Sequence, residues 1–430
     1  GGAQARPPLQ PLRGRPLRVG YVSADLCQHT VGLFIKDVLK AHNSERVQVF
    51  AYSAGAVKDW VTDEVAAVCT LRDVSALDEA ALAQCIRADG VDLLVDLSGH
   101  TAGSRLTAFA HRPAPVLVSW LGYFATTGLP VMDGVLLDEW HAPVGTESQF
   151  AEPIVRLPAG RFCYTPASWA PDAVAAPPCL QRGHITFGCF NNTAKYNVGV
   201  LDLWARVLQA VPRSHLVLKW RSFNDEDFCQ QVTTAFAQRG IAPERIELRG
   251  PSFHADLLKQ YADIDIALDP FPFTGGLTSC EALWMGVPVV TWPQSRVVSR
   301  QTHALLHQIG LPELSATNAE DYVRIAAQLA ADPARLTHLR ATLRDQMRAS
   351  PLMDTAAYPR QLEDALIGLY QTIEASTHST PQKANMTKIT IDNKEYDLAS
   401  LSSEAKAQLA SIQFVDNELA RLQAQAAALQ

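Results

Sequence analysis

The segment from residue 263 to residue 300 contains the residues best suited to binding an anion. It opens with an apolar run, Ile264 to Leu268, which has the length of a buried strand and is ended by Asp269 and two prolines. A glycine-containing loop, a helix start and a second apolar run from Val287 to Trp292 follow. Parallel sheets bind phosphates with units of this form. The loop contains Gly275 and Gly276, and the helix start that follows it is Thr278-Ser279-Cys280-Glu281.

An anion is the expected ligand of this loop for two reasons. Glycines let the backbone approach a ligand closely, and the free N–H groups at a helix start carry the positive end of the helix dipole. A capping box explains the same residues without a ligand, because Thr278 and Glu281 could each satisfy a backbone N–H group of the other. The spacing alone leaves both explanations open.

Lys195 is a second candidate for anion binding. It stands in CFNNTAKYNVGVLDLWARVL (residues 189–208), after a strand and before a helix. In a parallel sheet that position is the carboxyl edge, where ligands bind, and a lysine there could neutralise a diphosphate. A solvated surface lysine is the alternative that base rates favour. The surrounding FNNTAK sequence favours the binding role.

The first half of the chain offers residues for the other side of a reaction. SADLCQHTVGLFI (residues 23–35) places His29 and Gly32 at a strand-to-helix turn. A histidine at a cleft edge has a pKa suited to a general base, although it could equally cap the helix. DLSGHTAGSRL (residues 96–106) and RPAPVLVSWLGYFATTG (residues 112–128) end at further carboxyl edges and could hydrogen-bond a sugar or a peptide. Their candidate residues are His100, Tyr123, Thr126 and Thr127.

No metal site is expected. Asp263 and Asp265 form a DxD pattern, but they stand at the head of a buried strand, on the edge opposite the ligand, and are interpreted as structural. The eight cysteines are scattered without metal-binding spacing, which is typical of reduced thiols and predicts a cytoplasmic protein.

Composition narrows the class of protein and its partners. The 430 residues suggest two or three domains, and 47% hydrophobic with 19% charged residues is typical of a globular protein. A net charge of −7 gives no general attraction to nucleic acid or to an anionic membrane, so neither is expected as a partner. No run approaches the roughly 18 apolar residues of a membrane span. The chain does not begin with Met, which suggests a piece of a longer protein.

Strand and helix signals alternate through most of the chain. Four near-continuous apolar runs predict buried parallel strands over residues 17–25, 47–53, 91–98 and 114–121. Helical periodicity covers residues 31–42 and 76–90 between them, and the alternation restarts at residue 184. Helices over roughly residues 319–330, 333–348 and 359–375 are expected to close the second domain. The pattern predicts an α/β protein with two Rossmann-like domains facing a cleft.

The expected organisation has six parts. They are a disordered segment (1–14), a Rossmann-like domain (15–155), a Pro- and Ala-rich linker (156–183), a second Rossmann-like domain (184–375), a flexible linker (376–385) and a small appendage (386–430). The appendage begins at its own Met and predicts a hairpin turning at Asp392-Asn393, followed by a helix with a narrow apolar stripe.

Four blocks of sequence together resemble one known family. RPAPVLVSWLGY, FNNTAKYN, LDPFPF with the following GG and CEALWMGVPVVT, and SRQ are similar, in this order, to the catalytic region of the O-linked N-acetylglucosamine transferases and the related SPINDLY proteins. The resemblance covers roughly residues 15–375. It implies a GT-B fold, an inverting and metal-independent transfer from a nucleotide sugar, and Ser or Thr hydroxyls of proteins as acceptors. The first domain would lie on the acceptor side, and the second would bind the nucleotide sugar.

The resemblance also implies roles for single residues. Lys195 would hold the donor diphosphate, with Asn192 beside it, and Thr278 and Ser279 would present hydroxyl and N–H groups to the phosphates. Glu281 would bind the ribose. His29 matches a cleft histidine that serves either as the base or in positioning. Two departures stand out: Leu277 replaces a hydroxyl residue in the glycine loop, and Leu257 stands where a histidine is usual, with His254 as a substitute.

The favoured function is transfer of N-acetylglucosamine from UDP-N-acetylglucosamine to a peptide or protein, with UDP-glucose and GDP-fucose as other donors. The 386–430 tail is a candidate acceptor or recognition leader, or else a coiled-coil appendage. Its candidate acceptor hydroxyls are those of Thr387, Thr390, Ser400, Ser402 and Ser403. The alternatives are an asparagine-linked glucosyltransferase of the same superfamily and an inactive binding module. No cofactor is expected.

Overall fold

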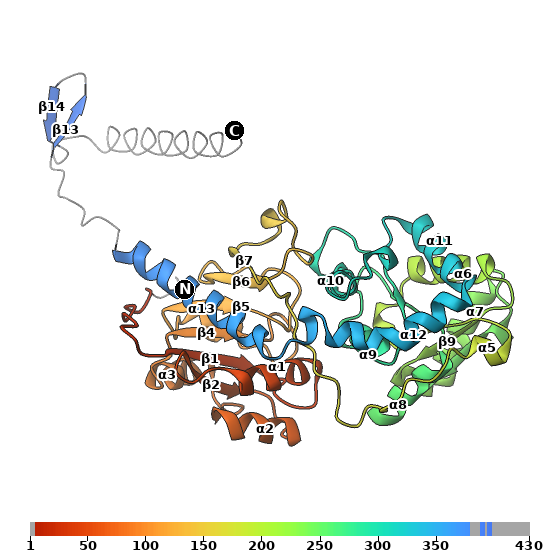
Figure 1. Cartoon of the computed structure of the whole chain (residues 1–430). Coiled ribbons are helices and arrows are strands. Elements are labelled where there is room, and N and C mark those ends of the chain that lie inside the picture. Colours follow the sequence, from red (N-terminus) through yellow and green to blue (C-terminus); the bar gives the residue numbers. More distant parts are fainter. Residues whose placement is uncertain (1–4, 379–387, 392–393, 398–430) are drawn as a thin grey trace. The chain divides into compact units, whose positions relative to one another are not determined.

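The structure, a computed structural model, describes residues 5–378, 388–391 and 394–397. Contacts between residues divide the chain into two units, residues 1–371 and 372–430. The first unit contains two parallel sheets with helices (Figure 1). None of the described helices is long and apolar enough to cross a bilayer.

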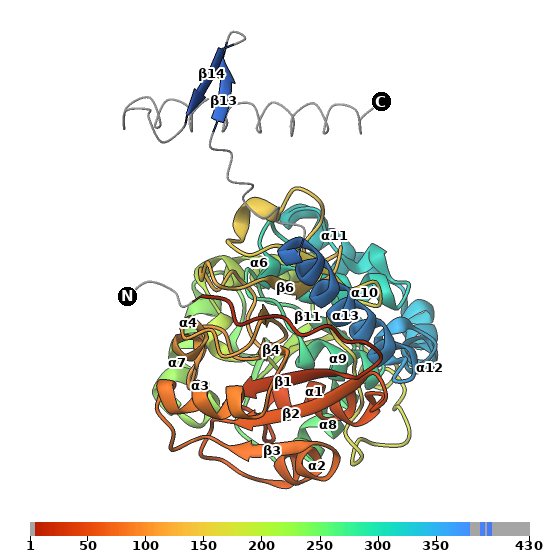
Figure 2. The same cartoon turned by 90° about the vertical axis from the view of Figure 1, so that its left-hand side faces the viewer.

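The first sheet has seven strands in the order β3-β2-β1-β4-β5-β6-β7, all parallel. Figure 2 shows β3, β2, β1 and β4 following one another in this order. Their bounds are β1 Leu17–Ser23, β2 Val47–Ser53, β3 Thr70–Asp73, β4 Leu93–Asp96, β5 Val116–Ser119, β6 Gly134–Leu137 and β7 Ile154–Arg156. The order reverses at β1, which pairs with both β2 and β4. A reversal of this kind opens a crevice at the carboxyl ends of the two strands, where ligands bind.

The helices of the first half are α1 Thr30–Ala41, α2 Trp60–Val68, α3 Glu79–Ala88 and α4 Leu106–Ala110. α1 packs against α2, and α3 packs against α4. Right-handed crossovers on either side of a reversal place helices on opposite faces of a sheet, which accounts for these two pairs. The core between sheet and helices includes Val22, Phe50, Tyr52, Ile86, Leu94 and Phe109, all buried.

The second sheet has five parallel strands in the order β10-β9-β8-β11-β12. Their bounds are β8 Thr186–Cys189, β9 His215–Lys219, β10 Ile246–Arg249, β11 Ile266–Leu268 and β12 Val289–Val290. The helices are α5 Cys179–Arg182, α6 Val198–Ala210, α7 Glu226–Ala237, α8 His254–Gln260, α9 Leu277–Trp284, α10 Gln301–Gln308, α11 Ala319–Ala330, α12 Pro333–Arg348 and α13 Ala357–His378. The predicted arrangement of two Rossmann-like halves is thereby confirmed.

The last long helix returns to the first half, although it was expected to close the second. Figure 1 shows α13 beside the strands of the first sheet. The carboxylate of Glu363 on α13 accepts hydrogen bonds from Arg46, from the Asn43 N–H and from His42. Tyr370 also bonds the backbone of Gln10. A long-range ion pair of this kind leaves no signal in local periodicity.

Two predicted segment boundaries are wrong for the described residues. Residues 5–14, expected to be disordered, are held by Arg6, which bonds the Pro115 carbonyl and the Asp133 carboxylate at 2.7 and 2.6 Å. The flexible linker expected from residue 376 begins inside α13, which extends to His378.

Of the tail, the structure describes two short antiparallel strands, β13 Lys388–Ile391 and β14 Lys394–Asp397. Their register pairs Ile391 with Lys394, as the predicted hairpin requires. Thr390 lies in β13. The expected helix and the other candidate acceptor hydroxyls, Thr387, Ser400, Ser402 and Ser403, lie outside the described residues.

Candidate active site

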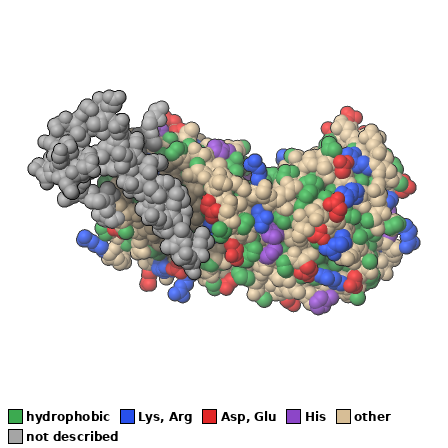
Figure 3. Space-filling view, turned by 90° about the horizontal axis from the view of Figure 1, so that it is seen from above, with side chains coloured by type: hydrophobic (Ala, Val, Ile, Leu, Met, Phe, Trp, Pro, Cys, Tyr) green, Lys and Arg blue, Asp and Glu red, His purple; other side chains and the backbone are tan. Residues whose placement is uncertain are grey.

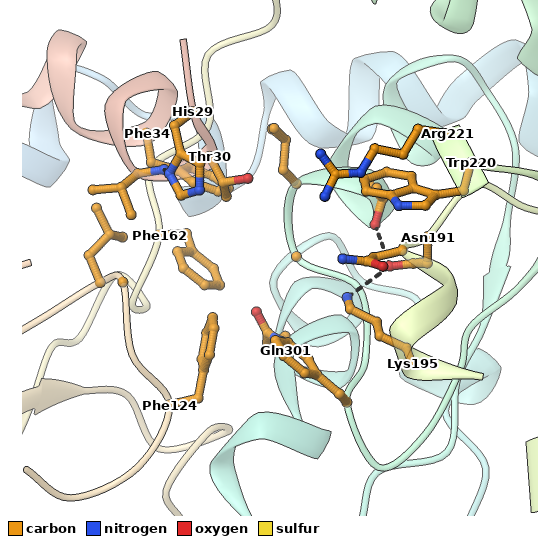
Figure 4. Close-up of a pocket in the computed structure, with 18 residues that line it drawn as sticks. His29, Thr30, Phe34, Phe124, Phe162, Asn191, Lys195, Trp220, Arg221 and Gln301 are labelled. Carbon is orange, nitrogen blue, oxygen red and sulfur yellow. Dashed lines mark hydrogen bonds between the residues drawn. The ribbon is translucent and has the colours of Figure 1, made fainter. Parts of the chain in front are cut away.

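A cavity of about 470 Å³ lies where the carboxyl edges of the two sheets meet, and both halves contribute to its wall. Figure 3 shows the molecule hollowed between the two halves. The first half supplies His29, Thr30, Phe34, Phe124 and Phe162, and the second supplies Asn191, Lys195, Trp220, Arg221 and Gln301 (Figure 4). A cavity between two halves can bring two substrates together.

Lys195 is anchored on the wall of the second half. It ends a single 3₁₀ turn, Thr193–Lys195, that follows β8. Its ammonium group donates to the Asn191 Oδ1 and to the Thr274 carbonyl, both at 2.9 Å, and lies 4.3 Å from the centre of the Phe273 ring. Burial lowers the pKa of Lys195, and the carboxylate of Asp269 opposes that effect. The cation is therefore fixed in place before any ligand arrives.

Asp269 fixes the backbone of the glycine loop. This buried carboxylate accepts from the Gly275 N–H at 2.7 Å and from the Thr291 hydroxyl at 2.6 Å. A side chain at Gly275 would have no room, since its Cβ would lie 2.2 Å from the Ser279 Oγ. α9 begins at Leu277, and Gly276, Leu277 and Thr278 all line the cavity. The start of a helix, with its free N–H groups, therefore meets the cavity.

The electrostatic character of the cavity is cationic. Its wall includes Lys195 and Arg221 but no Asp or Glu. Arg221 is exposed, and no ion pair of its guanidinium is found among the described residues. In Figure 4 this guanidinium points into the gap between the two halves. Two cations, a helix start and amide groups suit a diphosphate better than a metal ion.

His29 lies on the opposite wall, at the start of α1. Its Nδ1 accepts a hydrogen bond from the Val31 N–H at 3.3 Å, so it caps the helix, and it also lines the cavity. An Nδ1 that accepts must carry no proton, so the neutral ring has its proton on Nε2. A carboxylate oxygen, Asp25 Oδ2, lies 3.7 Å from Nδ1. His29 therefore caps the helix, one of the two roles that the sequence left open, and its ring also lines the cavity.

Comparison with known proteins identifies the family. The sequence matches glycosyl transferase family 41 over residues 7–165 and 178–362. The chain belongs to this family. It is 41% identical over 355 residues to the probable UDP-N-acetylglucosamine–peptide N-acetylglucosaminyltransferase SPINDLY of Solanum lycopersicum, covering 81% of this chain and 38% of that protein. The protein of the same name from Arabidopsis thaliana is 39% identical, with 83% and 40% covered. The chain thus spans about two fifths of these relatives.

A solved structure supports the same assignment. The O-GlcNAc transferase of Thermobaculum terrenum, solved as a mutant, superposes with a TM-score of 0.81 at 39% identity, covering 85% of this chain and 69% of that one. The galactosyltransferase WaaB shares the fold alone, with a TM-score of 0.53 and 13% identity. The GT-B fold and the family, both predicted from the four sequence blocks, are confirmed.

The donor-side residues predicted for this family-41 chain are only partly brought together. Lys195, Asn192, Gly276 and Thr278 line the cavity, whereas Gly275, Ser279 and Glu281 do not. Asn192 uses its Oδ1 to cap the turn at the Ala194 N–H, at 3.0 Å. The amide that contacts Lys195 is the preceding Asn191, which also accepts from the Thr278 hydroxyl at 2.9 Å. The Ser279 hydroxyl bonds Thr302 at 2.8 Å, away from the cavity.

Glu281 lies beside a smaller cavity of about 170 Å³ instead. Its Oε1 lies 2.7 Å from the His254 Nε2, and the His254 Nδ1 lies 3.1 Å from the Trp169 indole nitrogen. Because indole only donates, Nδ1 accepts and Nε2 carries the proton that is donated to Glu281. The hydrogen bond to Glu281 raises the pKa of His254, against the effect of burial. Since Glu281 bonds His254 and Gly276 is the N-cap, the alternative capping box is not formed.

Some of the predicted acceptor-side residues line a cavity, and others are buried or pack against the backbone. Tyr123 and Thr126 line a second cavity that adjoins the first. His100 stacks edge-on against Tyr123 and lies 2.8 Å from the Thr127 carbonyl, while Thr127 itself is buried. Gly32 lines neither cavity and is required for packing, because a Cβ there would lie 2.1 Å from the Cys27 carbonyl oxygen.

The DxD pair has structural partners, as expected. Asp265 accepts from the backbone N–H groups of Cys179 and Thr186, and Asp263 pairs with Arg182 and Arg249. No group of three or more His, Cys, Asp or Glu side chains that could hold a metal ion is found in the described part of the chain.

Several cavity residues carry no role in the sequence-based prediction. Trp220 and Arg221 directly follow β9, so the carboxyl-edge argument used for Lys195 could have found them. Gln301 stands in the SRQ block, and its side-chain amide donates to the Thr274 carbonyl at 3.1 Å. Phe124 and Phe162 come from separate loops, and nothing in the sequence predicts that their rings face one cavity.

Proposed function

We propose that this chain transfers N-acetylglucosamine from UDP-N-acetylglucosamine to Ser or Thr hydroxyls of a peptide or protein. The observation that carries the proposal is the carboxylate-free, cationic cavity between the two halves, in which Lys195 faces the start of α9. The names of the similar SPINDLY proteins, which specify a UDP-N-acetylglucosamine–peptide N-acetylglucosaminyltransferase, support this donor and a peptide acceptor. This chain spans only about two fifths of those proteins, so the activity and the acceptors named for them are proposed, not shown, for this chain.

The reaction we propose is a single displacement that inverts the anomeric carbon. The acceptor hydroxyl oxygen bonds to the anomeric carbon as the bond from that carbon to the diphosphate oxygen breaks, and the hydroxyl proton passes to a base. The leaving diphosphate gains negative charge in the transition state. Lys195 and the first N–H groups of α9 are positioned to stabilise that charge, and Arg221 adds a second cation.

The proposed reaction uses no metal ion. In metal-dependent sugar transfer, carboxylates hold the cation that neutralises the diphosphate, and oxygen ligands are what Mg²⁺ requires. The wall of this cavity has no carboxylate, and its donors are N–H, ammonium and guanidinium groups. These groups bind an anion directly, so the cations of the chain itself take over the neutralising role.

His29 is proposed to orient a substrate oxygen by donating from Nε2. The cap to the Val31 N–H leaves the proton on Nε2, which faces away from the helix. To accept a proton at Nε2, the ring would have to abandon the cap and direct an Nδ1–H at Asp25. The observed cap therefore favours positioning over base catalysis.

The 386–430 tail is proposed as an acceptor or recognition leader, because it follows a polar segment and begins like a separate small protein. Intact-mass analysis of the full chain incubated with donor tests this directly. Added sugar located in residues 386–430 by peptide mapping supports the role. Equal transfer to external peptides by the full chain and by a chain ending at residue 378, with no sugar on the tail, excludes it.

The decisive experiment for the function has two parts. A panel of UDP, GDP and their sugars is first tested for thermal stabilisation, because a ligand that binds only the folded protein raises the melting temperature. The best sugar nucleotide is then incubated with a Ser- or Thr-containing peptide library, and products are read by mass spectrometry. Stabilisation by UDP-N-acetylglucosamine with sugar on Ser or Thr is expected. Stabilisation by GDP-fucose, or sugar on asparagine, would replace the proposal, and no transfer at all would indicate a binding module.

A further inference from the structure

A second cavity of about 370 Å³ adjoins the proposed donor cavity, and the two share Gly122, Phe124 and Phe273. The rings of Phe124 and Phe273 come from opposite halves and meet edge-on, with centres 5.8 Å apart and planes at 63°. These rings form the partition between the cavities. A ligand in one cavity would lie next to a ligand in the other.

The wall of the second cavity is mainly apolar, although Thr101, Thr126 and Gln149 also line it. Its walls include Tyr123, Phe150, Val297 and Val298, and no Asp or Glu lines it. Arg296 at the rim is exposed, and no carboxylate partner of its guanidinium is found in the part of the chain that the structure describes. A cavity of this composition favours an apolar side chain that is followed or preceded by an acidic one.

The walls are fixed by contacts that need no ligand. The Arg161 guanidinium donates to the Leu121 carbonyl at 3.1 Å and lies 4.4 Å from the centre of the Phe124 ring. The carboxylate of Glu152 accepts from the Thr127 N–H at 2.8 Å and from the Thr126 hydroxyl, which lines the cavity. The side-chain amide of Gln149 donates to the Ser295 carbonyl at 3.0 Å, across the two halves. The cavity is therefore preformed.

We propose that this second cavity binds an apolar, preferably aromatic, side chain of the acceptor peptide, close in sequence to the Ser or Thr that receives the sugar. An extended peptide advances about 3.3 Å per residue, so a side chain within three residues of the acceptor hydroxyl can reach the adjoining cavity. Arg296 then pairs with an acidic residue next to the apolar one. The inference rests on the proposed function, because it assumes that a peptide is the acceptor.

Matched peptides test the inference. Each contains one Ser in an Ala-rich sequence and differs only in whether Phe, Leu, Ala or Lys occupies one of the three positions on either side. We expect kcat/KM for the best-placed Phe peptide to exceed that of its Ala counterpart by about 10- to 100-fold, the range that follows from burying an aromatic side chain. An added Glu beside the Phe is expected to give a further two- to threefold gain, about what an exposed ion pair contributes.

Substitutions at Phe150 and Arg296 connect the preference to this cavity. In Phe150→Ala the ratio of Phe-peptide to Ala-peptide rates is expected to fall toward one, and Phe150→Leu is expected to restore part of it. Phe228→Ala is the matched control, since Phe228 is also half-buried but lies on α7 and lines neither cavity. Arg296→Gln is expected to abolish only the gain from Glu.

Three results would overturn the inference in distinguishable ways. Equal rates for Phe and Ala peptides at all six positions would exclude an apolar subsite while leaving peptide transfer intact. A preference that survives in Phe150→Ala would place the subsite elsewhere. Thermal stabilisation by UDP with no transfer to any peptide would reject the proposed function itself.

Discussion

Replacing Lys195 with methionine tests whether this lysine has the proposed catalytic role or only a structural one. Methionine keeps most of the length of the side chain and removes the charge and all three N–H donors. In the proposed reaction Lys195 stabilises the departing diphosphate, which carries more charge in the transition state than in the bound donor. We therefore expect a large loss of transfer rate and a small change in stability.

The expected loss of rate follows from the geometry. At about 4 Å and an effective dielectric constant of about 20, one pair of unit charges interacts by about 4 kcal/mol, of which only the part that grows in the transition state affects kcat. Removing one donor to a developing anion typically costs about 2.7–4 kcal/mol, or about 10²- to 10³-fold in kcat. We expect Lys195→Met to lie in this range.

The expected effect on stability is small because every partner of Lys195 keeps another donor. Asn191 Oδ1 retains the Thr278 hydroxyl, and the Thr274 carbonyl retains the Gln301 amide. Burial already lowers the pKa of Lys195, so the fold disfavours its charged form and gains nothing from it. The contact with the Phe273 ring is lost, at a cost of about 0.5–1 kcal/mol. The free energy of unfolding should change by no more than about 1 kcal/mol.

The assay measures sugar transfer, melting temperature and stabilisation by UDP for wild type, Lys195→Met and Lys219→Met. Lys219 is the matched control, because it ends β9, is buried, donates to the Gly250 carbonyl at 2.7 Å and also has its pKa lowered by burial, yet it does not line the cavity. Its variant should transfer normally. If Lys195→Met transferred within about threefold of wild type with undiminished stabilisation by UDP, the assignment of the diphosphate to this cavity would be refuted. Unfolding of the variant would refute the stability argument.

Three further predictions concern Trp169, Asp25 and Asp96. Trp169→Phe tests the ribose contact that the family resemblance implies for Glu281, which lies outside the cavity that holds Lys195. The substitution removes the N–H that fixes the His254 tautomer, so Glu281 loses an oriented donor. If Glu281 holds the ribose, we expect weaker stabilisation by UDP and a raised donor KM with little change in kcat, whereas unchanged binding would reject that contact. Asp25→Asn should change kcat by less than about threefold if His29 only positions a substrate, whereas loss of a base would cost about 10² or more. Burial raises the pKa of Asp96 from 3.8 to about 6. The stability that this shift contributes is fully present below pH 3.8 and is lost as the pH rises through 6. In thermal denaturation, the melting temperature of Asp96→Asn should therefore fall less between these pH values than that of the wild type.

The fold was predictable where burial imposes a simple pattern. Strands such as β4 and β5 are buried on both faces and appear as apolar runs, whereas the edge strand β3, TLRD, is half exposed and has no such run. The sequence predicts the position of Lys195 because a residue that directly follows a parallel strand lies at the carboxyl edge of the sheet, whatever its distant contacts. Asn191 was missed in favour of Asn192, since the two are adjacent and only the 3₁₀ turn decides which amide faces the lysine.

Contacts between distant segments explain the remaining misses. The sequence indicates His254 only as a substitute for a missing histidine, because its partners Trp169 and Glu281 are far away in sequence. Trp169 stands in residues 166–177, which the family match leaves uncovered, so family resemblance gives no role to it either. The return of α13 to the first half depends in the same way on Glu363 meeting His42 and Arg46.

The distribution of charge across the cleft suits the two substrates of the proposed reaction. Its cations, Lys195 and Arg221, both come from the second half, and the first half contributes mainly the rings of Phe34, Phe124 and Phe162. In the proposed reaction the diphosphate lies against the second half, and the attached sugar is directed toward the aromatic wall. Aromatic faces can pack against the C–H groups of a sugar but cannot compete for its phosphates. The hydroxyl that attacks must then approach from the side of the first half, where the second cavity begins at Phe124. This order of anion, sugar and acceptor is the one that an inverting displacement requires.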